Sequence, residues 1–102
     1  MEMFIVILKS YLKNTPKSLQ DIEQTINDKD YKQIHVLAHG FKGILVSIGD
    51  KKVSKIARDM EILSKEKDEE TVRRLFSNLV EENDKLTEEI KEWLRENDPK
   101  RN

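Results

Sequence analysis

The spacing of the apolar residues is the feature that most constrains how this chain folds. Between about Tyr31 and Ile48 they recur every three or four positions, at Ile34, Leu37, Ala38, Phe41, Leu45 and Ile48. That spacing places all of them on one face of an α-helix. The 102 residues include only two prolines and three glycines, too few for the many turns of a β-domain. We therefore predict an all-α protein.

The N-terminal part of the chain is expected to form two helices. The first covers about Glu2 to Lys13 and ends at an Asn-Thr-Pro sequence. Thr15 suits an N-cap and Pro16 suits the first position of a new helix, because proline lacks the N–H that this position leaves unpaired. The second helix is expected to run from there to about Asn27.

The remaining chain predicts three more helices. Asp30 is placed to cap the helix over Tyr31–Ile48, and Gly49 followed by Asp50 predicts the end of that helix and the cap of the next. The last helix, about Glu70 to Glu96, has apolar residues in a seven-residue rhythm at Val72, Phe76, Leu79, Leu86, Ile90 and Trp93. Asn83 fills the remaining slot, either buried or facing solvent.

This rhythm is typical of near-parallel helix packing. The predicted fold is an up-and-down antiparallel four-helix bundle with an additional N-terminal helix covering one end. Residues 1–102 form a single domain, and residues 97–102 are expected to be a frayed tail.

Composition excludes several classes of function. The 19 basic and 20 acidic residues are interspersed, which argues against a nucleic-acid binder. There is no cysteine, so disulfides and thiol chemistry are excluded. The most apolar run, Met3 to Leu8, is too short to span a bilayer and lacks the features of a signal peptide. We expect a cytoplasmic monomer that binds no membrane.

His39 is the candidate functional residue. At about 100° per residue, it points almost directly away from the apolar face of its helix. Gly40 and Gly43 each cost this helix roughly 0.5–1 kcal/mol relative to alanine. Gly43 leaves an open approach one turn beyond His39, and Lys42 brings an ammonium beside the ring. These features suit a phosphoryl group.

The sequence AHGFKGILVSIGD, residues 38–50, resembles the histidine phosphotransfer (HPt) domain, whose pattern is Ala-His-x-Leu-Lys-Gly with a further glycine six residues later, here Gly49. Asp30 and the pair Met60-Glu61 also fall where this family tends to have Asp and Leu-Glu. The chain departs from the pattern at Ile44 and Leu45, where small residues are usual, and at Asp50, where Ala is common. The acceptor histidine, the lysine and the glycine are all present.

The resemblance implies that His39 accepts a phosphoryl group from the aspartyl phosphate of a receiver domain and passes it to another receiver aspartate. Neutral imidazole has a nitrogen lone pair for this reaction at cytoplasmic pH. In this interpretation Nε2 attacks, Lys42 screens the phosphoryl oxygens and Gly43 gives steric access. The Mg²⁺ that such transfer uses is assigned to the partner, and no cofactor is expected on this chain.

The same resemblance implies receiver domains of response regulators or a hybrid histidine kinase as partners. Without a glycine-rich phosphate loop or a candidate catalytic base, the chain is expected to be a transfer intermediate and no enzyme. Val36 and Val46 project to the same side as His39, and exposed apolar residues of this kind mark partner sites. We expect His35, Val36, Gly40 and Val46 to lie in or beside the docking surface.

Two other functions remain open from the sequence. The chain could be a helical adaptor that binds a partner through the exposed face of this helix without carrying phosphate. Alternatively, His35 and His39 have the i, i+4 spacing of a transition-metal site, although the sequence shows no third or fourth ligand. We predict no metal site.

Overall fold

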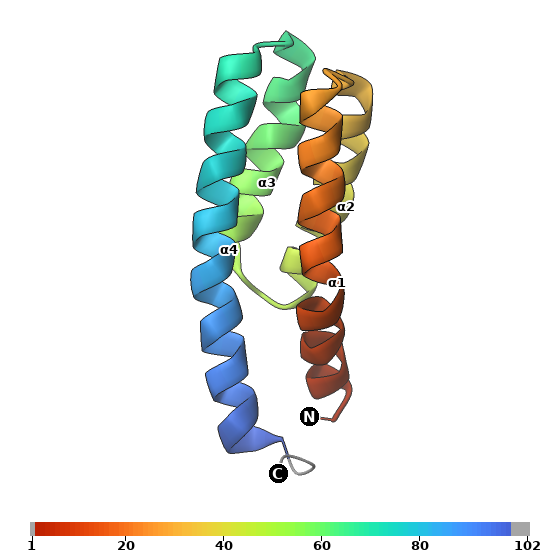
Figure 1. The fold of residues 1–102 in the computed structure, drawn as a ribbon. Helices are drawn as coiled ribbons and strands as arrows, with labels where there is room; N and C mark the ends of the chain where they lie inside the picture. The colour runs from red at the N-terminus through yellow and green to blue at the C-terminus, as the bar shows by residue number, and fades with distance from the viewer. Residues whose placement is uncertain (1, 99–102) are drawn as a thin grey trace.

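The structure, a computed structural model, describes residues 2–98. It contains four helices, α1 (Glu2–Asn27), α2 (Tyr31–Ser47), α3 (Lys51–Leu63) and α4 (Glu69–Asn97), with a short 3₁₀ turn, η1 (Ser64–Glu66), between the last two. Consecutive helices run antiparallel and pack side by side (Figure 1). This confirms the all-helical prediction. None of the described helices is long and apolar enough to cross a membrane.

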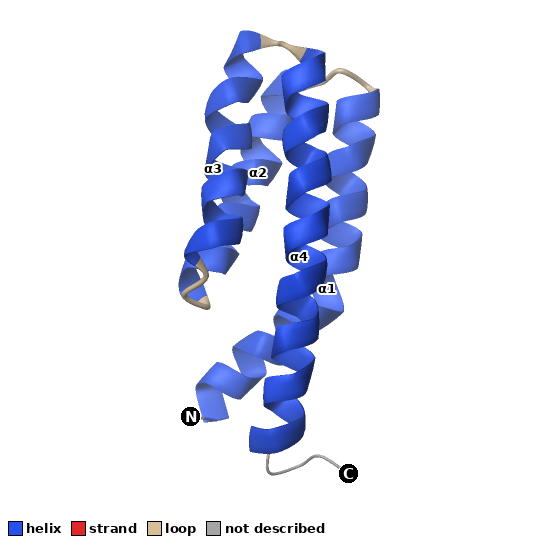
Figure 2. Cartoon of the chain, turned by 90° about the vertical axis from the view of Figure 1, so that its left-hand side faces the viewer, coloured by secondary structure: helices blue, strands red, loops and turns tan. Residues whose placement is uncertain are grey.

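The predicted break between two N-terminal helices is wrong, because α1 is one continuous helix with Pro16 inside it. Pro16 cannot donate to the carbonyl four residues earlier, and the Oγ1 of the adjacent Thr15 donates to the Tyr11 carbonyl at 2.5 Å. Figure 2 shows that α1 bends in its N-terminal half, as a proline inside a helix predicts. Both halves bury apolar residues in the same core, at Ile5, Leu8 and Tyr11 before the proline and at Ile22 and Ile26 after it. Among residues 2–98 no separate helix covers the end of the bundle.

The four helices differ in length, and this gives the molecule its shape. The first and last helices, α1 and α4, have 26 and 29 residues, whereas α2 and α3 have 17 and 13. The two long helices therefore continue beyond the α2–α3 turn as a two-helix stalk (Figure 2). In the stalk the Phe4 and Trp93 rings meet edge to face at 5.7 Å. Lys9 pairs with Asp98 at 2.6 Å, so α4 is held to its end at Asn97. Residues 99–102 of the expected tail lie outside the described residues.

Aspartates begin three of the helices, as the sequence predicts for the two after Asp30 and Asp50. The Asp30 side chain accepts a hydrogen bond from the Gln33 N–H at 3.2 Å, and the Asp50 side chain accepts from Val53 at 2.7 Å. Asp68 caps α4 in the same way. Gly49 has a φ of +79°, which glycine adopts without steric cost, and so ends α2 in a tight turn.

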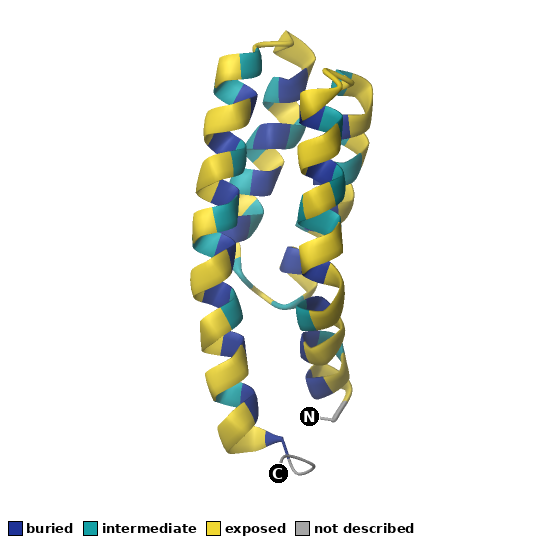
Figure 3. Cartoon of the chain, in the orientation of Figure 1, coloured by how far each residue is buried: buried dark blue, intermediate teal, exposed yellow. Residues whose placement is uncertain are grey.

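The core runs along the inside of the bundle (Figure 3), and one polar pair lies within it. Asn83 is only 3% exposed, and its Oδ1 accepts a hydrogen bond from the Tyr11 hydroxyl. Burial raises the pKa of the Tyr11 phenol, so the hydroxyl stays a donor at physiological pH. The Tyr11 ring also stacks on Phe41 at 6.2 Å. The slot that interrupts the apolar rhythm of α4 is therefore buried and links α1, α2 and α4.

Replacing Tyr11 by phenylalanine should destabilise the fold by about 1–3 kcal/mol, because it leaves the buried Asn83 amide without its donor. The double variant Tyr11→Phe/Asn83→Leu should recover most of this loss, since both polar groups are then gone. Urea unfolding of the single and double variants measures the coupling. Equal destabilisation in Tyr11→Phe and in the double variant would contradict the role assigned to this bond.

Candidate functional site

His39 lies on the surface of α2, with 64% of its side chain exposed. The opposite face of α2 is anchored in the core by Ile34, Ala38, Phe41 and Leu45, all buried. Because these residues fix the rotation of the helix about its axis, the imidazole is held outward, as the helical spacing predicts.

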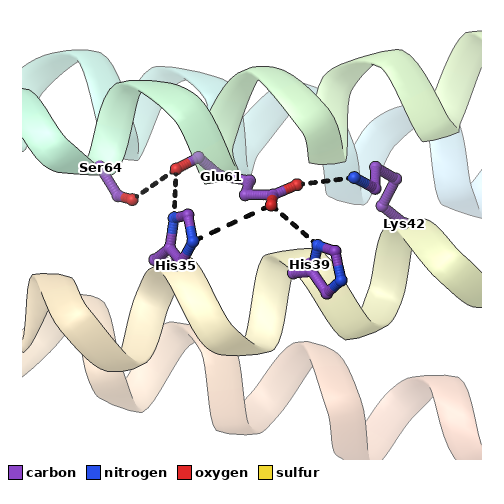
Figure 4. A network of polar contacts seen from close by, with 5 residues as sticks. All are labelled: His35, His39, Lys42, Glu61 and Ser64. Carbon is purple, nitrogen blue, oxygen red and sulfur yellow. Dashed lines mark hydrogen bonds and ion pairs between the residues drawn. The ribbon is translucent and has the colours of Figure 1, made fainter.

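The Glu61 carboxylate, from α3, joins His39 to Lys42 (Figure 4). Its Oε2 lies 2.8 Å from His39 Nδ1, and its Oε1 lies 2.9 Å from Lys42 Nζ. A carboxylate only accepts hydrogen bonds, so Nδ1 carries the hydrogen and donates it. In the neutral ring Nε2 then keeps its lone pair. The arrangement selects the imidazole tautomer in which the outer nitrogen, Nε2, keeps its lone pair.

His35 holds the same glutamate through its backbone. Its Nδ1 lies 2.8 Å from the Glu61 carbonyl oxygen, which also accepts a hydrogen bond of 2.8 Å from Ser64 Oγ (Figure 4). Carbonyls in the last turn of a helix lack intrahelical hydrogen-bond donors. His35 and Ser64 supply donors to the Glu61 carbonyl at the end of α3. His35 Nε2 is 3.9 Å from Glu61 Oε2. His35 thus positions Glu61 against α2.

The charges around Glu61 stabilise its ionised form. The hydrogen bond from Lys42 is the largest of the effects that lower the pKa of Glu61, and His39 adds to it, whereas desolvation opposes both. The carboxylate is therefore ionised throughout the physiological range. Its contribution to the α2–α3 contact is complete above the ordinary glutamate pKa and is lost as the pH falls through the lowered value.

The two glycines beside His39 face open space. A Cβ added at Gly40 or Gly43 would meet no atom within 4 Å. Packing inside this chain therefore does not require glycine at either position, even though glycine weakens a helix. Both positions leave the surface of α2 beside His39 clear of side-chain atoms.

The other expected docking residues lie around the imidazole. Val36 and Val46 are 52% and 63% exposed. Val36 and Gly40 line a groove of about 370 Å³ between α1 and α2, and His35 lines a second groove of about 390 Å³ at the α2–η1 end of the bundle. Residues 2–98 contain no group of three or more histidine, aspartate or glutamate side chains arranged to hold a metal ion.

Glu61 is the site residue whose role the sequence did not reveal. In the sequence, Glu61 stands out only as part of the Met60-Glu61 pair, which fits the family pattern. Its partners His39 and Lys42 lie 22 and 19 residues earlier in the chain, so helical spacing could not connect them. The last two turns of α3 contain two carboxylates, Asp59 and Glu61, and this was the sequence signal that could have indicated a partner for His39 or Lys42.

Replacing Glu61 by alanine should remove the bias toward the Nδ1–H tautomer of His39, because the acceptor on that nitrogen is lost. The ¹⁵N chemical shifts of the His39 ring measure the tautomer populations. Asp59→Ala removes a carboxylate of α3 that does not touch His39, and should leave the populations unchanged. Equal shifts in Glu61→Ala and in the unsubstituted protein would contradict the assignment.

Comparison with known proteins agrees with the geometry of the site. The family model of the Hpt domain matches residues 6–96, nearly the whole chain. Searches of curated proteins and of solved structures give no match. Because the family model covers far more than half of the sequence and includes His39, Lys42 and Glu61, the chain belongs to the Hpt domain family.

Proposed function

We propose that this protein is a phosphorelay intermediate in which His39 accepts a phosphoryl group from the aspartyl phosphate of a receiver domain and passes it to another receiver aspartate. Membership of the Hpt family supports histidine phosphotransfer in general. The observation that carries the assignment to His39 is its exposed ring with Nδ1 bound to Glu61, which leaves Nε2 free for attack.

The chemistry needs only a nucleophile and charge compensation from this chain. The Nε2 lone pair attacks phosphorus, the P–O bond to the donor aspartate breaks, and its electron pair leaves with the carboxylate. The ring then bears a positive charge with a hydrogen still on Nδ1, and the Glu61 carboxylate 2.8 Å away compensates it. In the onward step the N–P bond breaks and an acceptor aspartate forms the new P–O bond. Mg²⁺ bound by the partner would neutralise the phosphoryl oxygens.

Lys42 and Gly43 serve the phosphoryl group in this proposal. The Lys42 side chain is 27% exposed and paired with Glu61, so its ammonium is held near the site and can exchange that pairing for a phosphoryl oxygen. Gly43 leaves the approach open. The protein would act as a transfer intermediate without kinase activity.

The partner is expected to be a response-regulator receiver domain or a hybrid histidine kinase. The protein itself is expected to be a monomer in the cytoplasm. It would dock over the exposed face of α2, on His35, Val36, Gly40 and Val46. The half-exposed valines support this surface, because exposed apolar side chains beside a groove favour partner binding. The same valines would serve an adaptor that carries no phosphate, and the transfer experiment separates the two functions.

Replacing His39 by glutamine should abolish acceptance of labelled phosphate from a phosphorylated receiver domain while leaving the fold intact, because the residue is exposed. Gln33→Ala is the matched control, since it changes another exposed side chain of α2 that does not contact Glu61 and should keep a label on His39. If His39→Gln accepted as much label as the unsubstituted protein, the phosphorelay proposal would be wrong. Binding of the receiver without any transfer would favour the adaptor.

Replacing Gly43 by alanine should stabilise the protein by roughly 0.5–1 kcal/mol, because the position is helical and the added Cβ meets nothing. Transfer from a receiver domain should nevertheless become slower, since the methyl group intrudes on the approach to His39. Phosphoramidate, a small donor that needs less room, should still phosphorylate the variant at close to the normal rate. Unimpaired transfer from the receiver domain would refute the steric role.

A further inference from the structure

A groove beside the site carries an unusual concentration of cations. It has a volume of about 390 Å³ and lies where the start of α2 meets η1. Lys32 comes from α2, and Lys65 and Lys67 come from η1 and the residue after it. We call these three lysines and the space between them the basic groove. Its walls are mainly apolar and include Tyr31 and Val36.

The lysines of the basic groove form no ion pair within residues 2–98. Lys32, Lys65 and Lys67 take part in none of the ion pairs of the described chain, although other lysines do. Two of the acidic residues at this end cap helices: Asp30 caps α2 and Asp68 caps α4. Glu66 is next to two of the lysines in sequence but does not line the groove.

The groove is continuous with the phosphoacceptor face of α2. His35 and Val36 line it and lie one turn from His39. The 17 residues of α2 contain no aspartate or glutamate, whereas 20 of the 102 residues of the chain are acidic. Glu61, the acidic side chain that contacts His39, is paired with Lys42. From the groove to His39, α2 therefore carries no acidic side chain of its own, on a protein whose net charge is −1.

Lys67 provides a second, independent observation. Its backbone is left-handed, with a φ of 55°, a conformation that glycine adopts far more easily than lysine. Nothing within the described chain pairs with its ammonium to offset this strain. Lys29 has nearly the same φ, 56°, but its ammonium lies 3.6 Å from Glu69. A side chain kept at a strained position without an internal partner suggests an external one.

We infer that the basic groove docks a carboxylate-rich segment of the receiver domain that exchanges the phosphoryl group with His39. The inference rests on the proposed function and deepens it by naming the chemistry of the partner. Unpaired cations call for an anionic partner, and the apolar walls suit the aliphatic parts of glutamate or aspartate side chains. Such a surface accelerates encounter and orients the partner more than it tightens the complex, which suits a relay that must release its partner.

The charge reversal Lys65→Glu/Lys67→Glu tests this inference. The probe is the phosphorylated receiver domain that exchanges most rapidly with the unsubstituted protein. At low salt the second-order rate constant for transfer should fall on the order of tenfold or more, and the difference should shrink as salt screens the charges. The rate at saturating receiver and the rate with phosphoramidate should stay within about twofold, because the groove directs encounter and does no chemistry.

Two matched controls separate docking from charge and backbone effects. Lys13→Glu/Lys91→Glu makes the same change of net charge at exposed, unpaired lysines on α1 and α4 and should leave transfer nearly unchanged. Lys67→Gly removes the ammonium and relieves the strained backbone, so it should unfold at a higher temperature yet dock more weakly. Lys29→Gly should gain stability without losing transfer.

The inference would be wrong if the second-order rate constant for transfer were unchanged in Lys65→Glu/Lys67→Glu. It would also be wrong if Lys13→Glu/Lys91→Glu lowered that rate constant equally. If the unsubstituted protein accepted no phosphate from any receiver, the proposed function would fail instead. Calorimetric titration with the receiver domain would then test docking in the basic groove independently of transfer. Weaker binding by the charge-reversed variant would support docking there, and equal binding would refute it.

Discussion

The Glu61 carboxylate is the contact on which the functional arrangement depends. It joins α3 to α2 through His39 and Lys42, and its own backbone is held by His35 and Ser64. A single acidic side chain thereby fixes the ring orientation, the tautomer and the position of the nearby ammonium. The outward direction of His39 comes from the packing of α2, but the tautomer that leaves a lone pair on Nε2 comes from this glutamate.

The bundle supports this contact by holding α2 and α3 in fixed register. Asp30 and Asp50 set where the two short helices begin, and Gly49 makes the tight turn between them. The buried bond between Tyr11 and Asn83 ties the long helices together near Phe41. A polar pair in the core favours one alignment of the helices over shifted ones, because a shift leaves both groups buried without partners.

Local chemistry in the sequence predicted much of this structure. The helical spacing of α2, the aspartate caps and the turn at Gly49 were predictable because each depends on residues within a few positions of one another. Pro16 misled because its local preference for a helix start was outweighed by the burial of residues on both sides of it. The burial of Asn83 and the role of Glu61 could not be decided, since both depend on side chains brought together from distant parts of the chain.

The unequal helix lengths have a consequence for how the molecule opens. In the stalk α1 and α4 face each other, and only Phe4 and Leu8 of α1 line a pocket with the α2–α3 turn, so separating them exposes less apolar surface than separating the four helices around Phe41. Amides of the first turns of α1 and the last turns of α4 should therefore exchange with solvent through local opening, while those of α2 exchange only when the whole bundle unfolds. The end of the protein that can loosen is the one that does not carry His39.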